Sequence, residues 1–240
     1  SDPFHIGGFH LFEKNIQARM VRCYGVVSQG ANKAFVLDFM CNGNLEENTI
    51  LDQTMKSKII YQILFALDYL HSHNLIHCDI KLSSILLNRD YDAFLTGFSH
   101  VHDYVSLVKR TINIGTFPFM APEVLKGSDK YSFQSDLYSL GILIYEFSTG
   151  REPFDKLTIL DAFKKGSKGD VDKLSINVGP IKKLFDTITS ENLNERSTSF
   201  ILRKMFEKEF LFYSNTDEEI ILNFIEKIKL EQAEKDKVDK

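Results

Sequence analysis

The stretch that decides the fold is residues 75–87, which read Leu75-Ile76-His77-Cys78-Asp79-Ile80-Lys81-Leu82-Ser83-Ser84-Ile85-Leu86-Leu87. Before it, apolar residues recur three and four positions apart from Thr54 to about Ser72, which predicts a long helix with one buried face. After it, residues 84–87 and 93–96 are short strand-like runs separated by a turn-prone segment. A bare His-x-Asp triplet is common by chance, and its Asp could simply cap a helix. The flanking segments therefore have to decide its meaning.

Three further patterned segments follow in order along the chain. They are Phe94-Leu95-Thr96-Gly97-Phe98-Ser99, Gly115-Thr116-Phe117-Pro118-Phe119-Met120-Ala121-Pro122-Glu123 and Ser135-Asp136-Leu137-Tyr138-Ser139-Leu140-Gly141. From Asp136 to Ser148 the chain is apolar almost all round, which predicts a helix buried on most sides. With this many segments in one order, chance is a poor explanation of the triplet.

Together these segments resemble the eukaryotic-type protein kinases. Residues 77–84 are similar to the catalytic loop His-Arg-Asp-Leu-Lys-x-x-Asn, residues 97–99 lie where Asp-Phe-Gly belongs, and residues 121–123 match Ala-Pro-Glu. The resemblance covers about residues 21–200. It implies an α+β, protein kinase-like fold, mainly the helical large lobe, with a truncated or degenerate small lobe. The implied domains are a partial small lobe in 1–40, a large lobe in 41–230 and a charged tail in 231–240, which we expect to fray.

The resemblance also implies which residues would form the active site. Asp79 corresponds to the catalytic base and Lys81 to the phosphate-facing lysine, although both could persist for structural reasons. A weak nucleotide-binding set would comprise a gatekeeper, two hinge residues and a residue beneath the adenine ring, namely Leu37, Asp38, Met40 and Leu86. For Leu37 and Leu86, a plain core position is an equally good interpretation.

Five other residues resemble the family's structural positions. His77 and Phe98 would belong to the hydrophobic column that links the lobes. Glu123 and Arg196 would form a buried ion pair. Asp136 would accept backbone N–H bonds from the catalytic loop, because a buried carboxylate needs hydrogen-bond donors.

Both metal-holding positions of the family have changed in this sequence. In kinases the magnesium ions are held by the Asp of Asp-Phe-Gly and by the catalytic-loop Asn, and here those positions are Gly97 and Ser84. Glycine offers no side-chain ligand, and serine offers one neutral hydroxyl where a hard dication prefers carboxylate oxygen. We therefore expect no bound metal and interpret the chain as a degenerate member of the family, a pseudokinase.

Two other features of the family are changed or missing. Cys78 replaces the catalytic-loop Arg that meets an activation-loop phosphate, so phosphorylation of Ser106 or Thr111 should not order that loop by the usual route. We interpret Cys78 as a small, semi-buried hydrophobe. No Gly-x-Gly-x-x-Gly motif occurs, and Gly7-Gly8 is a poor substitute for it. A strand carrying the nucleotide-binding lysine is not found before Val21 either.

Two classes of function remain open. The first is a catalytically dead, protein-binding scaffold or allosteric regulator in signalling, whose partner would be another signalling protein, for example an active kinase. The alternative is a weak or unconventional kinase, of the serine/threonine type because of Lys81 and Gly115-Thr116. No cofactor is expected, although ATP without magnesium stays open, and so does a domain that senses nucleotide without transferring phosphate.

The bulk composition excludes some partners. The 240 residues carry a formal net charge of −4 and show no basic stripe, so we expect no nucleic-acid partner. No apolar run approaches the roughly 18 residues of a membrane span, so no membrane partner is expected. The three cysteines lack metal-ligand spacing and are expected to be reduced thiols of a cytoplasmic protein.

Overall fold

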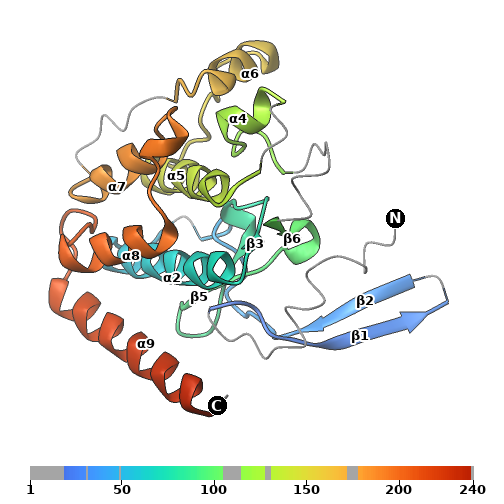
Figure 1. The fold of residues 1–240 in the computed structure, drawn as a ribbon. Coiled ribbons are helices and arrows are strands. Elements are labelled where there is room, and N and C mark those ends of the chain that lie inside the picture. The colour runs from blue at the N-terminus through green and yellow to red at the C-terminus, as the bar shows by residue number, and fades with distance from the viewer. Residues whose placement is uncertain are drawn as a thin grey trace.

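The computed structural model describes residues 19–30, 32–48, 50–104, 115–127, 131–171 and 178–238 (Figure 1). Its helices are α2 (Gln53–Ser72), α4 (Pro122–Leu125), α5 (Phe133–Thr149), α6 (Ile159–Ser167), α7 (Ile181–Ile188), α8 (Ser199–Lys208) and α9 (Glu218–Val238), with 3₁₀ turns η1 (Leu82–Ser84), η2 (Phe98–His100) and η3 (Leu193–Glu195). Its strands are β1 (Cys23–Gln29), β2 (Asn32–Leu37), β3 (Leu75–Ile76), β4 (Ile85–Leu87), β5 (Ala93–Leu95) and β6 (His102–Asp103). Among these residues helices predominate over short strands, which is the α+β organisation that the sequence predicts.

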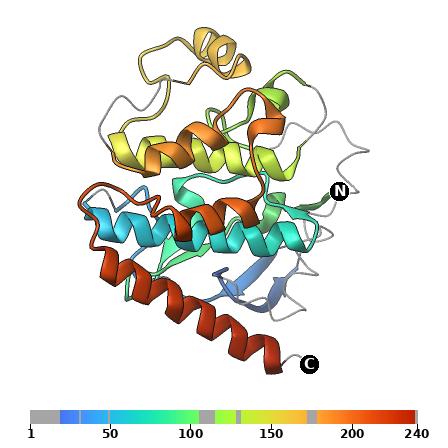
Figure 2. The same ribbon diagram turned by 60° about the vertical axis from the view of Figure 1, so that its left-hand side comes forward.

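The long helix α2 lies at the centre of the large lobe, where α5, α8 and α9 pack against it (Figure 2). It begins after Asp52, whose side chain accepts a hydrogen bond from the backbone N–H of Met55 at 2.7 Å. The predicted apolar face is buried, and its members are Ile59, Ile60, Ile63, Leu64, Leu67 and Leu70. The helical period of the sequence therefore located both the helix and its buried side.

Helix α5 is buried on most sides, as the sequence predicts, but it begins earlier than the predicted Asp136. Its first turn is closed by a capping box, in which the backbone N–H of Ser132 donates to the hydroxyl of Ser135 at 3.1 Å. The helix ends at Gly150, whose φ of 66° lies in the left-handed region that glycine adopts at little cost.

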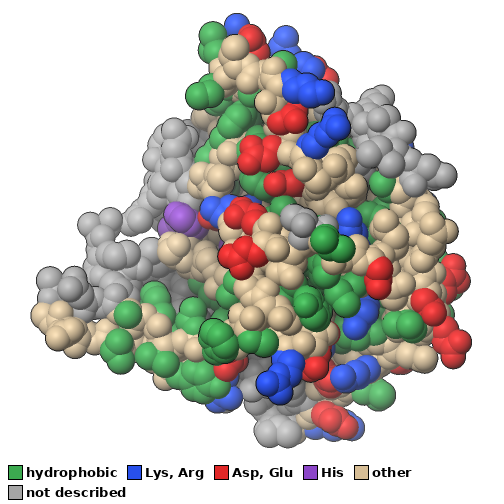
Figure 3. All heavy atoms as spheres, turned by 180° about the vertical axis from the view of Figure 1, so that it is seen from behind, with side chains coloured by type: hydrophobic (Ala, Val, Ile, Leu, Met, Phe, Trp, Pro, Cys, Tyr) green, Lys and Arg blue, Asp and Glu red, His purple; other side chains and the backbone are tan. Residues whose placement is uncertain are grey.

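The strands form separate two-stranded pairs: β1 with β2, β3 with β6 and β4 with β5. We call β1 and β2 together the hairpin arm, because they project from the helical body (Figure 1). Hydrophobic side chains gather on this arm at the surface (Figure 3), and they include Tyr24, Val27, Phe35, Val36 and Leu37. The second strand ends at Leu37, and one further bond of the same ladder follows it, from the N–H of Asp38 to the carbonyl of Arg22 at 3.0 Å.

The C-terminal helix α9 has a different cap, and extends further, than the sequence pattern indicates. Thr216 and Glu219 resemble a capping box in the sequence, yet the residue that caps the helix is Asp217, which accepts from the N–H of Ile220 at 3.1 Å. The Thr216 hydroxyl instead meets the hydroxyl of Ser57 on α2 at 2.8 Å. The expected fraying of 231–240 does not hold for 231–238, which continue the helix. Within the described residues, no helix is both long and apolar enough to cross a membrane.

A buried ion pair joins α4 to the segment before α8. The Nη1 of Arg196 lies 2.8 Å from the Oε1 of Glu123, and the same oxygen accepts a hydrogen bond from the Ser135 hydroxyl at 3.0 Å. The guanidinium of Arg196 also covers the ring of Tyr138 at 4.8 Å. Only 2% of Arg196 is exposed, so its charge depends on these partners. This is the pair that the sequence leads us to expect.

We predict that Glu123→Ala strongly destabilises the domain, because it leaves the Arg196 guanidinium buried without its carboxylate. Loss of one partner from such a pair costs about 3–5 kcal/mol. Urea unfolding followed by circular dichroism measures the change. The matched control is Glu191→Ala, which removes an exposed pair with Lys126 and should cost about 0–1 kcal/mol. Equal, small effects from both variants would contradict a supporting role for the Glu123–Arg196 pair.

Glu146 on α5 is a carboxylate held in a poorly solvated position. Its Oε2 is buried and has no hydrogen-bond partner among the described residues. Burial raises the pKa of Glu146 to about 7, and the carboxylates of Glu152 and Glu46 add to this effect. The folded pKa thus exceeds the unfolded value of about 4.3. Stability must therefore fall as pH rises from about 4 to about 7.

We predict that Glu146→Gln gains stability relative to the native chain as the pH rises, because glutamine cannot ionise. The free energy of unfolding is to be measured at pH 5 and pH 8 for both proteins. The difference should be larger at pH 8. Glu226→Gln, an exposed change on α9 that affects a contact with Lys229, serves as the control and should give little pH dependence. A Glu146→Gln difference that is the same at both pH values would refute the assignment.

Candidate functional site

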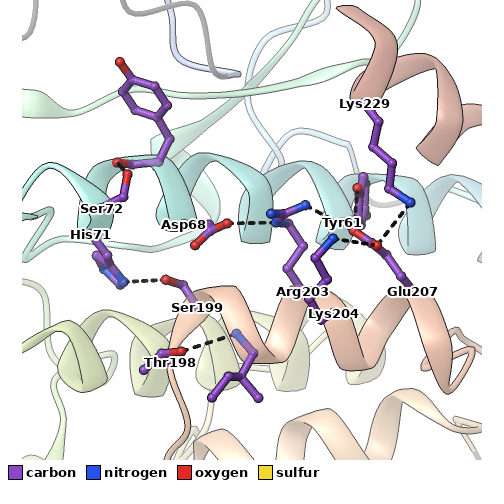
Figure 4. Close-up of polar contacts among 12 residues, drawn as sticks. Tyr61, Asp68, His71, Ser72, Thr198, Ser199, Arg203, Lys204, Glu207 and Lys229 are labelled. Atoms are coloured by element: carbon purple, nitrogen blue, oxygen red, sulfur yellow. Dashed lines mark hydrogen bonds and ion pairs between the residues drawn. The ribbon is translucent and has the colours of Figure 1, made fainter. Parts of the chain in front are cut away.

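The loop between β3 and η1 is fixed by the carboxylate of Asp136 at the start of α5. Its two oxygens accept the backbone N–H groups of His77 at 2.8 Å and Cys78 at 2.9 Å. The imidazole Nε2 of His71 lies 3.0 Å from the same carboxylate, and its Nδ1 lies 3.1 Å from the Ser199 hydroxyl (Figure 4). Asp136 is only 1% exposed, and these contacts satisfy it. The backbone bonds expected for Asp136 are therefore present, whereas no motif in the sequence indicates a role for His71 or Ser199.

Asp79, Lys81 and Thr116 form a closed polar triad at the mouth of this loop. The Thr116 hydroxyl donates to Oδ1 of Asp79 at 2.8 Å, and the Lys81 ammonium lies 3.0 Å from Oδ2 of Asp79. The same ammonium donates to the Thr116 hydroxyl at 2.8 Å. His100 approaches Oδ2 of Asp79 at 3.7 Å. The structure thus brings the two predicted catalytic residues together.

The charge of Asp79 is stabilised in place. Burial alone would raise the pKa of Asp79, but the Thr116 hydrogen bond and the Lys81 ammonium together hold it below its usual range. Asp79 is consequently a carboxylate at neutral pH with its proton-accepting oxygens already engaged. Such an arrangement can orient a hydroxyl group near Thr116, and it can equally serve to hold the loop.

The hydroxyl of Ser84, the first changed metal position, is hydrogen-bonded to the backbone of Lys81. It accepts from the N–H of Lys81 at 2.9 Å and donates to the carbonyl of Lys81 at 2.7 Å. Ser84 is buried, and its own carbonyl accepts from the N–H of Thr96 at 2.9 Å. The hydroxyl therefore closes the η1 turn and is a poor donor for a cation.

Gly97, the second degenerate metal position, lies beside Ser84. A Cβ on Gly97 would be 3.6 Å from the Cβ of Ser84 and 3.7 Å from the Cε1 of His77. The φ of 85° and ψ of 32° are left-handed, which glycine adopts freely and Asp or Asn adopts more readily than other residues. The two positions are thus adjacent, as a metal site requires, yet they supply no carboxylate. Their donor set does not fit a magnesium ion.

The pair of His77 and Phe98 links the loop to η2. Their rings meet edge to face with centroids 5.9 Å apart, and His77 Nε2 donates to the carbonyl of Thr96 at 2.8 Å. Its Nδ1 accepts from the N–H of Asp79 at 3.3 Å. Burial lowers the pKa of His77 despite the nearby carboxylate of Asp136, so the imidazole is neutral in this position. A link between lobes through these residues stays a prediction.

Cys78 is a buried apolar group at the position of the family's arginine. Its side chain packs with Ile76, Tyr131 and Phe133, and burial raises the pKa of its thiol, with Asp136 adding to the effect. It lines a cavity of about 10 Å³ together with Thr116 and other residues, which is room for roughly one water molecule. The expected role as a small, semi-buried hydrophobe agrees with this packing.

The four residues proposed to contact a nucleotide lie around the base of the hairpin arm. Leu37 ends β2, and the Asp38 carboxylate accepts a hydrogen bond from the Tyr24 hydroxyl at 2.6 Å. Met40 begins a turn in which its carbonyl accepts from the N–H of Gly43 at 3.1 Å. Leu86 lies on β4, opposite Phe94. Nucleotide contact by any of them remains a prediction.

Some positions weighed in the sequence lie outside the described residues. These are Gly7-Gly8, Ser106 and Thr111. Two residues of the site, His100 and Thr116, were not predicted to contact Asp79, and Thr116 stands out in the sequence only as part of the Gly115-Thr116 pair. For Thr116 that pair could have served as a signal, because it resembles the serine/threonine kinases. For His100, no spacing in the sequence predicts its approach to Asp79.

The comparisons with known proteins agree with this geometry. The protein kinase domain family matches residues 9–211. An Aurora kinase of Debaryomyces hansenii is 33% identical over 162 residues, which are 65% of this chain and 39% of that protein. An Aurora kinase of Schizosaccharomyces pombe is 31% identical over 193 residues, 78% of this chain and 52% of that protein. A probable serine/threonine-protein kinase of Dictyostelium discoideum is 30% identical over 190 residues, 74% of this chain and 14% of that protein.

The chain therefore spans about half, or less, of the length of these relatives. The family match, in contrast, includes the catalytic loop, the degenerate metal positions and the Glu123–Arg196 pair, and it extends over most of the residues present. On this evidence, the chain belongs to the protein kinase domain family.

Proposed function

We propose that this chain is a catalytically dead kinase-like domain that acts as a protein-binding scaffold or allosteric regulator. The observation that carries the proposal is the pair of adjacent positions Ser84 and Gly97. One offers a hydroxyl already bonded at both ends to Lys81, and the other offers no side chain. Phosphoryl transfer depends on cations that neutralise charge developing on the phosphate, and in kinases these two positions hold them.

The proposed partner is another signalling protein, for example an active kinase. The large lobe supports this because the two carboxylates at its catalytic loop have their hydrogen-bond partners without a ligand. Asp136 is satisfied by amides and by His71, and Asp79 by Thr116 and Lys81. A domain with such an interior presents a constant surface whether or not nucleotide is bound, as a scaffold requires.

A weak or unconventional serine/threonine protein kinase is the second candidate. It is favoured by the Asp79–Lys81–Thr116 triad, whose short contacts keep a carboxylate and an ammonium poised around a hydroxyl. In this alternative, Asp79 would accept a proton from a substrate hydroxyl, and Lys81 would face the transferred phosphate. The relatives named as serine/threonine kinases lend it support.

We predict that the native chain shows no magnesium-dependent binding of ATP, whereas the double variant Gly97→Asp with Ser84→Asn gains it. The added carboxylate supplies charge next to position 84, and Asp tolerates the left-handed backbone there. Thermal shift is to be compared between magnesium with ATP and ATP with a chelator. We expect no difference for the native chain and a clear rise with magnesium for the double variant.

The matched control is Gly97→Asn with Ser84→Asn, which has nearly the same shape without the charge. It should behave like the native chain. A magnesium-dependent rise of several degrees in the native chain would overturn the proposal. An equal rise in the control and in the charged variant would show that charge at position 97 is not what is missing.

We predict that Asp79→Asn leaves any residual phosphotransfer unchanged, because no step depends on Asp79 as a base in a dead domain. Transfer of labelled phosphate to a generic serine/threonine substrate is measured for the native chain and for Asp79→Asn, with a Lys81→Met variant as a second probe. Signal at the level of the blank in all three supports the proposal. Activity that falls about 100-fold or more in Asp79→Asn, the range typical of a lost general base, would establish the weak kinase instead.

A further inference from the structure

Arg19 is a buried cation where the chain enters the hairpin arm. It is only 9% exposed, and its guanidinium lies 3.2 Å from a carboxylate oxygen of Asp92 and 3.2 Å from one of Glu231. The rings of Phe94 and Phe224 flank it, at 5.5 Å and 5.8 Å from its Cζ to their centroids. We call these five residues the Arg19 junction. They come from the chain before β1, from the β4–β5 hairpin and from α9.

The backbone of Arg19 is tied to the strand that leads into the degenerate metal site. Its carbonyl accepts from the N–H of Leu95 at 2.8 Å, and the N–H of Val21 donates to the carbonyl of Leu95 at 2.9 Å. Leu95 ends β5, and Gly97 follows closely in the sequence. The segment that leads into the hairpin arm is therefore hydrogen-bonded to the strand that leads to Gly97.

Helix α9 is held to the large lobe by a buried stripe and by a charged cluster. Ile221, Phe224, Ile225 and Ile228 are buried against the core. Glu207 on α8 meets Lys229 of α9 at 3.1 Å, and it also meets Lys204, Arg203 and the Tyr61 hydroxyl (Figure 4). Burial alone would raise the pKa of Glu207, but the hydrogen bond and the charge of Lys229 outweigh burial, so the pKa of Glu207 is lowered. Two nearby residues of α9 thus make separate contacts. Lys229 contacts Glu207 on the large lobe, and Glu231 contacts Arg19 at the root of the hairpin arm. We call these two contacts the anchors of α9.

Through these two anchors, α9 connects the large lobe to the root of the hairpin arm. The helix crosses below α2, and its C-terminal part approaches the root of the hairpin arm in both views (Figures 1 and 2). The hairpin arm itself leaves Tyr24, Val27 and other apolar side chains exposed, so its own packing contributes little to fixing its direction. A cation as buried as Arg19 needs its carboxylates, because an unpaired buried charge is costly.

We propose that α9 sets the orientation of the hairpin arm through the Glu231–Arg19 ion pair, and so couples the C-terminal helix to the base of the small lobe. The Glu207 cluster fixes the first anchor on the large lobe. The Glu231 carboxylate is the second anchor and the weaker one, since its side chain is 41% exposed. Loss of the Glu231–Arg19 pair would then free the arm without displacing α9, because the buried stripe still holds the helix to the large lobe. This inference is independent of whether the domain transfers phosphate.

The test is a distance measurement on the full chain between the arm and the large lobe. Gln29 at the end of β1 and Lys208 at the end of α8 are replaced by cysteine and spin-labelled, in a background with Cys23→Ser and Cys41→Ser. Pulsed dipolar spectroscopy gives the distribution of label separations. Glu231→Gln and Arg19→Gln are then compared with Glu226→Gln. This control on the same helix removes the contact of Glu226 with Lys229 but leaves the Glu207–Lys229 and Glu231–Arg19 pairs in place.

We expect Glu231→Gln and Arg19→Gln to broaden the distribution at least twofold, whereas Glu226→Gln leaves it unchanged. The melting temperature of Glu231→Gln should stay within about 2 °C of the background, because an exposed carboxylate contributes little to global stability. An unchanged distribution in Glu231→Gln would overturn the proposal. Equal broadening in Glu226→Gln would overturn it as well, because the effect would then follow from any charge change on α9. If Arg19→Gln fails to fold, Glu231→Gln alone decides.

Discussion

The buried carboxylate of Asp136 is the constraint on which the rest of the large lobe depends. A charge with 1% exposure can remain in the interior only if donors surround it. Those donors are the amides of His77 and Cys78 and the imidazole of His71, so the start of the catalytic loop, the end of α2 and the start of α5 must converge on one point. This requirement is met entirely from within the chain.

The same convergence explains why catalytic residue types can be present without a demonstrated reaction. Once Asp136 fixes the loop, Asp79 faces Thr116 and Lys81 and forms a self-sufficient triad. Loss of Asp79 would leave the Thr116 hydroxyl without its acceptor and the Lys81 ammonium without its counter-charge. Selection for a folded loop can therefore maintain this carboxylate and this ammonium, and their presence discriminates poorly between an enzyme and a scaffold.

The sequence predicted what depends on local periodicity and motif spacing. The limits of α2, the burial of α5 and the Glu123–Arg196 pair are of this kind, since each follows from a helical repeat or from the resemblance to kinases. Outside the segments that resemble kinases, the sequence did not predict contacts of a side chain with residues far away along the chain. Thr216 does not cap α9: its hydroxyl contacts Ser57 on α2, and Asp217 caps the helix. The Arg19 junction was missed because Asp92 and Glu231 lie far from Arg19 in the sequence.

The charge balance of the site suggests why its two metal positions could change together. Carboxylates brought close to one another in a poorly solvated site repel and raise each other's pKa unless a cation lies between them. With Gly97 and Ser84 in place, Asp79 is the carboxylate that remains, and the Lys81 ammonium at 3.0 Å neutralises it. Among the described residues of the site, the charge of Asp79 is thus balanced by a side chain of the same loop. A loop whose charge is balanced by its own side chains is held in place by the chain itself, and the proposed scaffold role rests on this property.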